Sequence, residues 1–271
     1  MKVTRLAIFI FCLLFPFQGF AQESSNVKNG SDIDRILDLV SVEQTLTELP
    51  KDLKNQFSQN PFGISASKNK QLVQLFSEAY HADSLSNIVH RSFKKKFNSG
   101  YSDAVLSVLQ SDKIKPILTS ESNFYTVQGI RKQIVTKYEL EQDEPTQERI
   151  SIIKEVIEHS SAKESQVESQ TILFRSFVLG TDAISSRLSL SEAQTDGIIN
   201  NFKNRLQMQV EDELVNNYLV MYHGLEDNRL SKFADFYTTE AGTEFKKSLS
   251  DAIHTAFREA SDRFISSVES L

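Results

Sequence analysis

Cysteine is nearly missing from the sequence, and this scarcity excludes several kinds of chemistry. The only cysteine, Cys12, lies in an apolar run close to the first residue. The rest of the chain therefore forms no internal disulfide, which excludes an exported disulfide scaffold. Glycine is also scarce, at 9 of 271 residues, and no glycine-rich phosphate-binding loop is present. Stability must come from packing, and the length suffices for a large core.

Acidic residues outnumber basic ones, which bears on the partners that the chain can bind. Lysine and arginine total 30 against 36 aspartates and glutamates, a net charge of −6. An acidic protein repels nucleic acid and anionic membrane surfaces, so neither is expected as a main partner. Beyond the N-terminal run, no second apolar stretch approaches the ~20 residues that a membrane-spanning helix needs.

The N-terminal run has the parts of a secretory signal peptide. Basic residues precede an apolar stretch over residues 6–17, and small residues follow it up to Ala21. The stretch is too short to span a bilayer. We therefore expect residues 1–21 to be a signal peptide cleaved after Ala21, and the protein to be periplasmic or secreted. Residues 22–30 are polar and are predicted to be a disordered lead-in.

Apolar residues recur at helical spacing through the rest of the chain, which predicts an all-α protein. Ser31 has the position of an N-cap, with Asp34 three residues later to complete a capping box. This first helix is expected to end near Pro50, and the polar segment 160–169 is expected to form a loop. Strand signals are nearly absent. The predicted fold is therefore an antiparallel helical bundle with short connections.

Two pairs of segments repeat similar spacing in the two parts of the sequence. Residues 34–42 align with 148–156 at an offset of 114, and residues 97–109 align with 225–237 at an offset of 128. This pattern fits an internal duplication, although any two amphipathic helices share spacing, so chance similarity stays open. The interpretation divides the chain into an N-terminal helical half at residues 31–143 and a C-terminal helical half at residues 146–271.

No motif with established catalytic or metal-binding chemistry is visible. The five histidines include no pair at i, i+4 spacing and no His-Glu-x-x-His sequence. The acidic residues do not form a calcium-loop pattern, and no Gly-x-Ser-x-Gly nucleophile elbow occurs. The sequence therefore predicts no catalytic residue, no metal ligand and no cofactor.

Residues 230–246 have the pattern of a helix, a tight corner and a second helix. Thr238 or Thr239 can cap the second helix, and Glu240 would lie in its first turn, where negative charge is favourable. Gly242 has no side chain, so we expect it to let the preceding aromatic pair pack across the corner.

This stretch resembles the signature of an uncharacterised family of exported bacterial helical proteins, the domain of unknown function 2059. The matching residues are Leu230, Phe236, Tyr237, Thr238, Thr239, Ala241, Gly242 and Lys246. The likeness covers only the C-terminal part of the chain, and Glu240–Ala241 stand where such families often place a proline. In the first half, residues 108–112 resemble the signature only faintly. The resemblance implies a helical exported domain, and it supplies no activity and no catalytic residues.

The leading functional hypothesis is a non-enzymatic binding or interaction protein of the cell envelope. Two similar halves packed together would leave an interface between them, a common place for a ligand site. The candidate ligand-binding residues are Tyr222, Phe236 and Tyr237, although each could be an ordinary core aromatic. The expected partner is a protein or a small apolar ligand of the envelope, and no nucleic acid is expected.

Two other functions stay open. An enzyme could assemble its site from residues far apart in the sequence, in which case acids, histidines and tyrosines should converge on one pocket. An assembly factor would instead dock another protein through an exposed apolar patch of more than about 400 Å².

Overall fold

The computed structural model describes residues 31–185 and 190–271, and its regular elements are all helical, which confirms the predicted all-α bundle. The predicted signal peptide and lead-in lie outside the described residues. The α-helices are α1 (Asp32–Leu39), α2 (Val42–Ser58), α3 (Ala66–Ala79), α4 (Ala82–Lys96), α5 (Ser102–Leu109), α6 (Lys115–Phe124), α7 (Val127–Gln142), α8 (Gln147–Ser160), α9 (Ala162–Ile184), α10 (Glu192–Met221), α11 (Asp227–Thr238) and α12 (Glu240–Glu269). A short 3₁₀ helix, Ser99–Tyr101, precedes α5.

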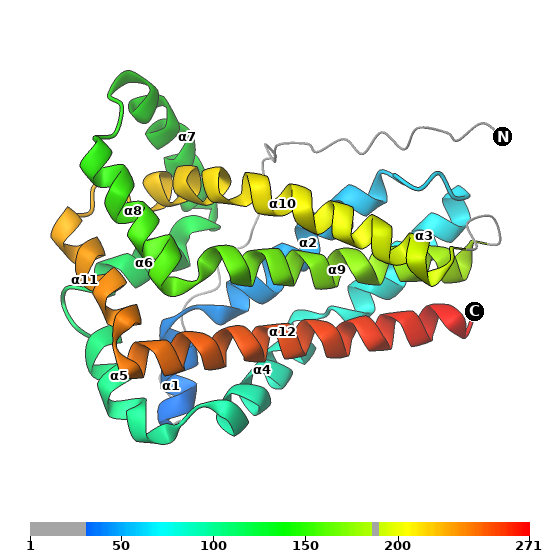
Figure 1. Ribbon diagram of the computed structural model, residues 1–271, viewed down its shortest axis with the longest axis horizontal. Coiled ribbons are helices and arrows are strands. Elements are labelled where there is room, and N and C mark those ends of the chain that lie inside the picture. Colours follow the sequence, from blue (N-terminus) through cyan, green and yellow to red (C-terminus); the bar gives the residue numbers. More distant parts are fainter. Residues whose placement is uncertain (1–30, 186–189) are drawn as a thin grey trace.

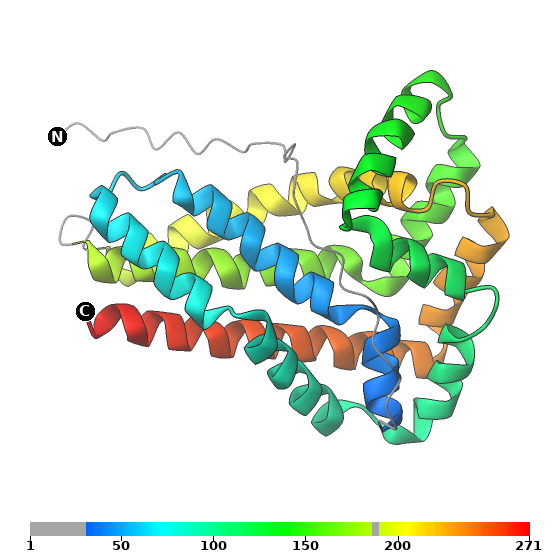
Figure 2. The same ribbon diagram turned by 180° about the vertical axis from the view of Figure 1, so that it is seen from behind.

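Long helices form the body of the molecule, and short ones gather at one end (Figure 1). α9 contacts both α10 and α12 along the body, and α10 runs antiparallel to α9. α2, α3 and α4 cover the other side of this layer (Figure 2). α5, α6, α8 and α11 lie at the end where α12 begins, and α7 projects from that end. Within the described ranges, no helix combines the length and the apolar composition that crossing a membrane requires.

The predicted start of the first helix is confirmed, but its predicted end is wrong. Ser31 and Asp34 form the expected capping box, in which each side chain accepts a hydrogen bond from the other residue's backbone N–H. Pro50 lies inside α2 and does not end it. A proline removes one backbone donor from a helix, but the apolar stripe of α2 continues past it. The buried residues of α2 are Val42, Leu46, Pro50, Leu53 and Phe57. Tertiary packing therefore outweighs the helix-breaking tendency of the proline.

Two helix junctions turn at a serine in the left-handed backbone region. Ser41 separates α1 from α2 at φ 48°, and Ser161 separates α8 from α9 at φ 57°. The expected loop over residues 160–169 is therefore wrong, because the chain re-enters a helix after one residue. Polar residues at the start of α9 mislead the sequence interpretation, since their side chains are compatible with a partly exposed helix face.

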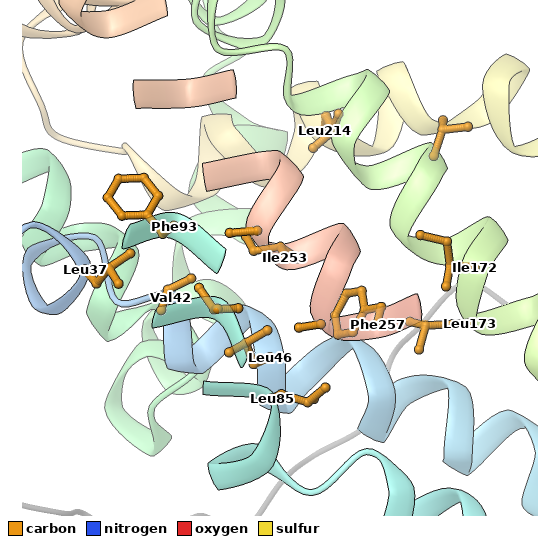
Figure 3. Close-up of a cluster of buried hydrophobic side chains, with 14 of the residues drawn as sticks. Leu37, Val42, Leu46, Leu85, Phe93, Ile172, Leu173, Leu214, Ile253 and Phe257 are labelled. Carbon is orange, nitrogen blue, oxygen red and sulfur yellow. The ribbon is translucent and has the colours of Figure 1, made fainter. Parts of the chain in front are cut away.

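One hydrophobic core holds buried residues from both halves of the sequence. Part of it is shown in Figure 3, where side chains of α1, α2 and α4 face side chains of α9, α10 and α12. Aromatic rings from several helices contact one another within it. The ring centroid of Phe177 on α9 lies 3.5 Å from that of Phe57 on α2 and 4.2 Å from that of Phe76 on α3. The two halves therefore share one core.

Gly180 sets the distance between α9 and α12. A Cβ atom at this position would lie 2.6 Å from the ring of Phe264 on α12 and 3.2 Å from a methyl group of Leu72 on α3. Both neighbours are fully buried, so the surrounding core has little freedom to move away.

We expect Gly180→Ala to destabilise the protein by about 1–3 kcal/mol, because the added methyl group overpacks the core. Urea unfolding followed by circular dichroism measures the change. Gly197→Ala is a matched control inside α10, where a Cβ atom would meet nothing within 4 Å. The control should stabilise the protein by about 0.5–1 kcal/mol through helix propensity. Equal effects of the two substitutions would contradict the role given to Gly180.

Candidate functional site

A groove of about 570 Å³ lies between the two halves of the chain. Its N-terminal wall is formed by α5 and the segment leading into α6, and its C-terminal wall by α11 and the start of α12. The first wall contributes Ala104, Ser107, Val108, Ser111, Lys113 and Ile114. The second wall contributes Lys232, Asp235, Phe236, Thr239 and Ala241. We call this the α5–α11 groove.

Two lysines meet at the α5–α11 groove without an acidic partner. The proximity of Lys232, whose positive charge repels that of Lys113, lowers the pKa of Lys113. Neither lysine forms an ion pair with any residue that the structure describes. Arg229 lies close by, but its charge is already paired, because its Nε is 3.4 Å from Glu226 Oε2; its Nη1 donates to the main-chain oxygen of Asp112 at 2.6 Å. An anion placed here would relieve the repulsion between like charges.

The predicted corner of residues 230–246 positions Phe236 at the groove. Thr239 caps α12, since its hydroxyl accepts a hydrogen bond from the Gly242 N–H at 3.0 Å and donates to the Phe236 main-chain oxygen at 2.7 Å. A Cβ atom on Gly242 would lie only 1.9 Å from the same Phe236 oxygen. The expectation that a glycine permits the tight corner is therefore confirmed.

The N-terminal half contains a corner with the same hydrogen bonds. Thr126 caps α7, accepting from the Gly129 N–H at 3.1 Å and donating to the Asn123 main-chain oxygen at 2.7 Å. A Cβ atom on Gly129 would again lie 1.9 Å from that oxygen. Phe124 and Tyr125 directly precede the capping Thr126, whereas Thr238 separates Phe236 and Tyr237 from the capping Thr239. The shared spacing is that of the capping threonine and the glycine three residues later, and with an aromatic pair shortly before it this is a signal that could have identified the corner from sequence.

The weak first-half match expected at residues 108–112 therefore does not mark the equivalent corner. These residues end α5 and begin the following segment. Val108 and Ser111 line the groove opposite the C-terminal corner. The residues of this segment do not share the corner's geometry because no threonine cap and no glycine stand there.

Arg149 on α8 fixes the segment that leads into α11. Its Nη1 donates to Asp227 Oδ1 at 2.5 Å and to the Leu225 main-chain oxygen at 3.0 Å. Its Nη2 donates to the Tyr222 main-chain oxygen at 2.7 Å. Charge-assisted bonds to helix-terminal carbonyls are among the stronger hydrogen bonds in proteins. One arginine thus holds the end of α10, the connecting segment and the start of α11 together.

Glu121, Tyr218, Tyr222 and Tyr237 form an acid–tyrosine cluster between α6, α10 and α11. The Tyr222 hydroxyl donates to Glu121 Oε1 at 2.5 Å. Desolvation raises the pKa of Glu121 to about 7, against an ordinary value of 4.5. Burial, with the nearby Glu121 charge, raises the pKa of each of the three phenols above its ordinary value. Each phenol therefore stays protonated at neutral pH and can serve as a hydrogen-bond donor.

The three candidate residues from the sequence do not share one site. Phe236 lines the α5–α11 groove, whereas Tyr222 and Tyr237 belong to the acid–tyrosine cluster. Tyr222 is only 1% exposed, and its hydroxyl is bonded to Glu121. Sequence reasoning missed Lys113 and Lys232, since the fold alone brings these distant positions together.

A second groove, of about 360 Å³, lies between α9, α10 and α12. Several of its charges are already paired, because Glu168 lies 2.7 Å from Arg258 and 3.8 Å from Lys203, and Lys163 lies 2.6 Å from Glu211. The Nε2 atom of His254 is 3.2 Å from the Ser165 main-chain oxygen, and desolvation lowers the pKa of His254. These satisfied groups have structural roles, so we assign no ligand to this groove.

Within residues 31–185 and 190–271, no group of three or more histidine, cysteine, aspartate or glutamate side chains is arranged to hold a metal ion.

No protein-family model, no curated protein and no solved structure matches the chain. The resemblance of residues 230–246 to the domain of unknown function 2059 therefore stays a prediction.

The unfolding free energy of the Glu121→Gln variant should increase, relative to that of the unsubstituted protein, as the pH rises from 5 to 8. The raised pKa means that folded Glu121 keeps a proton that the unfolded chain releases between pH 4.5 and about 7. Stability conferred by the protonated group is therefore lost as pH rises through this window. We expect the difference in unfolding free energy to change by about 1–2 kcal/mol over this range. This is less than the full pKa shift would give, because the side chain is partly exposed and solvent screens it. A difference that does not depend on pH, measured by urea unfolding, would contradict this account.

Proposed function

We propose that this protein is a non-enzymatic binding protein of the cell envelope whose α5–α11 groove takes an anionic amphipathic ligand. The observation that carries the proposal is the pair Lys113 and Lys232, which lie together at the groove and form no ion pair with any described residue. A carboxylate or phosphate on a hydrocarbon chain matches this combination of charge and apolar surface.

The size and lining of the groove support this ligand class. A volume of about 570 Å³ lies within the range of small-molecule sites. Val108 is the partly exposed apolar side chain of the lining, and the largely buried Ile114 and Phe236 form the apolar floor behind it. Asp235 adds one negative charge to the lining, which favours a ligand with a single charged head over a polyanion.

The acid–tyrosine cluster is the best support for the alternative of an enzyme. Its geometry favours a structural role, because Tyr222 is buried and already hydrogen-bonded to Glu121. The raised pKa values also keep the three phenols protonated at neutral pH, so none of them is available as a general base. We therefore do not propose an activity for these residues.

Export is part of the same proposal, and it rests on the N-terminal sequence pattern. We expect the protein recovered from the periplasm or the medium to begin at Gln22, because cleavage follows Ala21. N-terminal sequencing of the recovered protein checks this. An intact N-terminus on membrane-bound protein would contradict it.

Replacing Lys113 and Lys232 by glutamine should weaken the binding of dodecanoate by at least about tenfold, because each charge-assisted bond contributes ~1.5–3 kcal/mol. Isothermal titration below the micelle concentration measures the affinity. Dodecanol, which has the same chain and no charge, should bind weakly to both proteins.

The matched control is Lys94→Gln with Lys95→Gln, which removes two exposed lysines from the end of α4. This variant has the same net charge as the groove variant, so a nonspecific charge effect would weaken binding equally in both. Equal affinities of the groove variant and the unsubstituted protein would overturn the proposed site.

A further inference from the structure

Helix α7 presents one face to the body of the protein and leaves the opposite face uncovered. Thr136 is 2% exposed, and Gln133 Nε2 donates to the Phe124 main-chain oxygen at 2.6 Å. Ile134 and Tyr138, in contrast, are 68% and 64% exposed. Figure 1 shows α7 projecting from the end of the molecule. Large apolar side chains with this exposure on a projecting helix are typical of a docking surface.

The exposed face of α7 has a regular order of charge. Arg131, Ile134, Tyr138 and Glu141 follow one another at intervals of three, four and three residues, so they form one stripe along the helix. We call this the α7 stripe. Arg131 and Glu141 at its two ends form no ion pair with any other residue in the described part of the chain.

The order of charge on α7 does not serve the stability of the helix itself. Its first turn contains no acidic residue and its last turn contains no basic residue. The last turn contains Glu139 and Glu141, where the helix dipole disfavours negative charge. Glu139 has a histidine nearby, since its Oε2 lies 3.8 Å from His223 Nδ1, whereas Glu141 has no such neighbour. An ion pair with a partner outside the chain would compensate for this unfavourable placement.

We propose that the α7 stripe pairs antiparallel with the α7 stripe of a second copy of this chain. The antiparallel arrangement is self-complementary, because Arg131 of each copy meets Glu141 of the other at both ends. In the middle, Ile134 of each copy packs on Tyr138 of the other. A parallel arrangement would instead place Arg131 against Arg131 and Glu141 against Glu141, which is unfavourable. Thr136 faces away from the partner in this geometry, as its burial requires.

The pairing involves one helix from each copy, so the interface is small. Interfaces below standard size form weak, concentration-dependent complexes. We therefore expect dimers in the micromolar range of concentration. Lys137, which flanks the stripe, remains at the rim in contact with water.

The test is sedimentation equilibrium of the purified protein over a range of concentrations. The unsubstituted protein should dimerise, and Ile134→Asp should abolish dimerisation because it places a charge in the centre of the contact. Arg131→Glu and Glu141→Arg should each weaken dimerisation by about tenfold, since each turns two attractive pairs into repulsive ones.

Two charge-restoring combinations distinguish the proposed pairing from a general effect of charge. The double variant R131E/E141R exchanges the two ends and should dimerise as the unsubstituted protein does. An equimolar mixture of R131E and E141R should form heterodimers, because each acidic end then meets a basic one. A monomer at every concentration, or a dimer unaffected by these changes, would overturn the proposal. Circular dichroism of each variant shows that the fold is retained.

Discussion

The packing of α12 against α9 and α4 is the constraint on which the rest of the structure depends. Gly180 permits it, because any side chain there would occupy space that the Phe264 ring fills. α4 belongs to the N-terminal half and α12 to the C-terminal half, so this contact holds the halves in one core. α12 also begins directly after the Thr239 cap, at the corner that Gly242 closes. Its position therefore determines where α11 and Phe236 lie, and hence the shape of the α5–α11 groove.

Local structures such as helix caps and tight corners could be predicted from the sequence, whereas the α5–α11 groove could not. The capping box at Ser31 and the corner at Gly242 depend on residues within one turn of each other, so their patterns indicate them directly. Lys113 and Lys232 are far apart in sequence and meet only through tertiary packing. At Pro50 the local signal itself was misleading. A proline predicts the end of a helix, but α2 continues past it because the apolar side chains on both sides of Pro50 are buried. Tyr222 was predicted as a ligand-binding residue, whereas the structure buries it against Glu121, a partner that the sequence could not indicate.

The two corners give the suggestion of an internal duplication a physical basis. Thr126 with Gly129, and Thr239 with Gly242, make the same pair of hydrogen bonds and the same close approach to a main-chain oxygen. The helices that follow differ in their surroundings. α12 is buried along its length between α9 and α4, whereas α7 buries only one side chain, that of Thr136. On this interpretation, the helices that follow the two corners have different roles. α12 completes the core, whereas its counterpart α7 is free to contact a partner. The duplication itself stays a prediction.

Native mass spectrometry of the protein, purified gently from the cells that produce it, shows whether the α5–α11 groove holds a ligand. The account predicts a discrete added mass on the protein that corresponds to an anionic amphipathic molecule, and its loss from protein produced with Lys113 and Lys232 both replaced by glutamate. The same variant should keep the helical content of the unsubstituted protein. An unsubstituted protein that carries no added mass, or an added mass that the variant retains, would contradict the assignment of the α5–α11 groove as the ligand site.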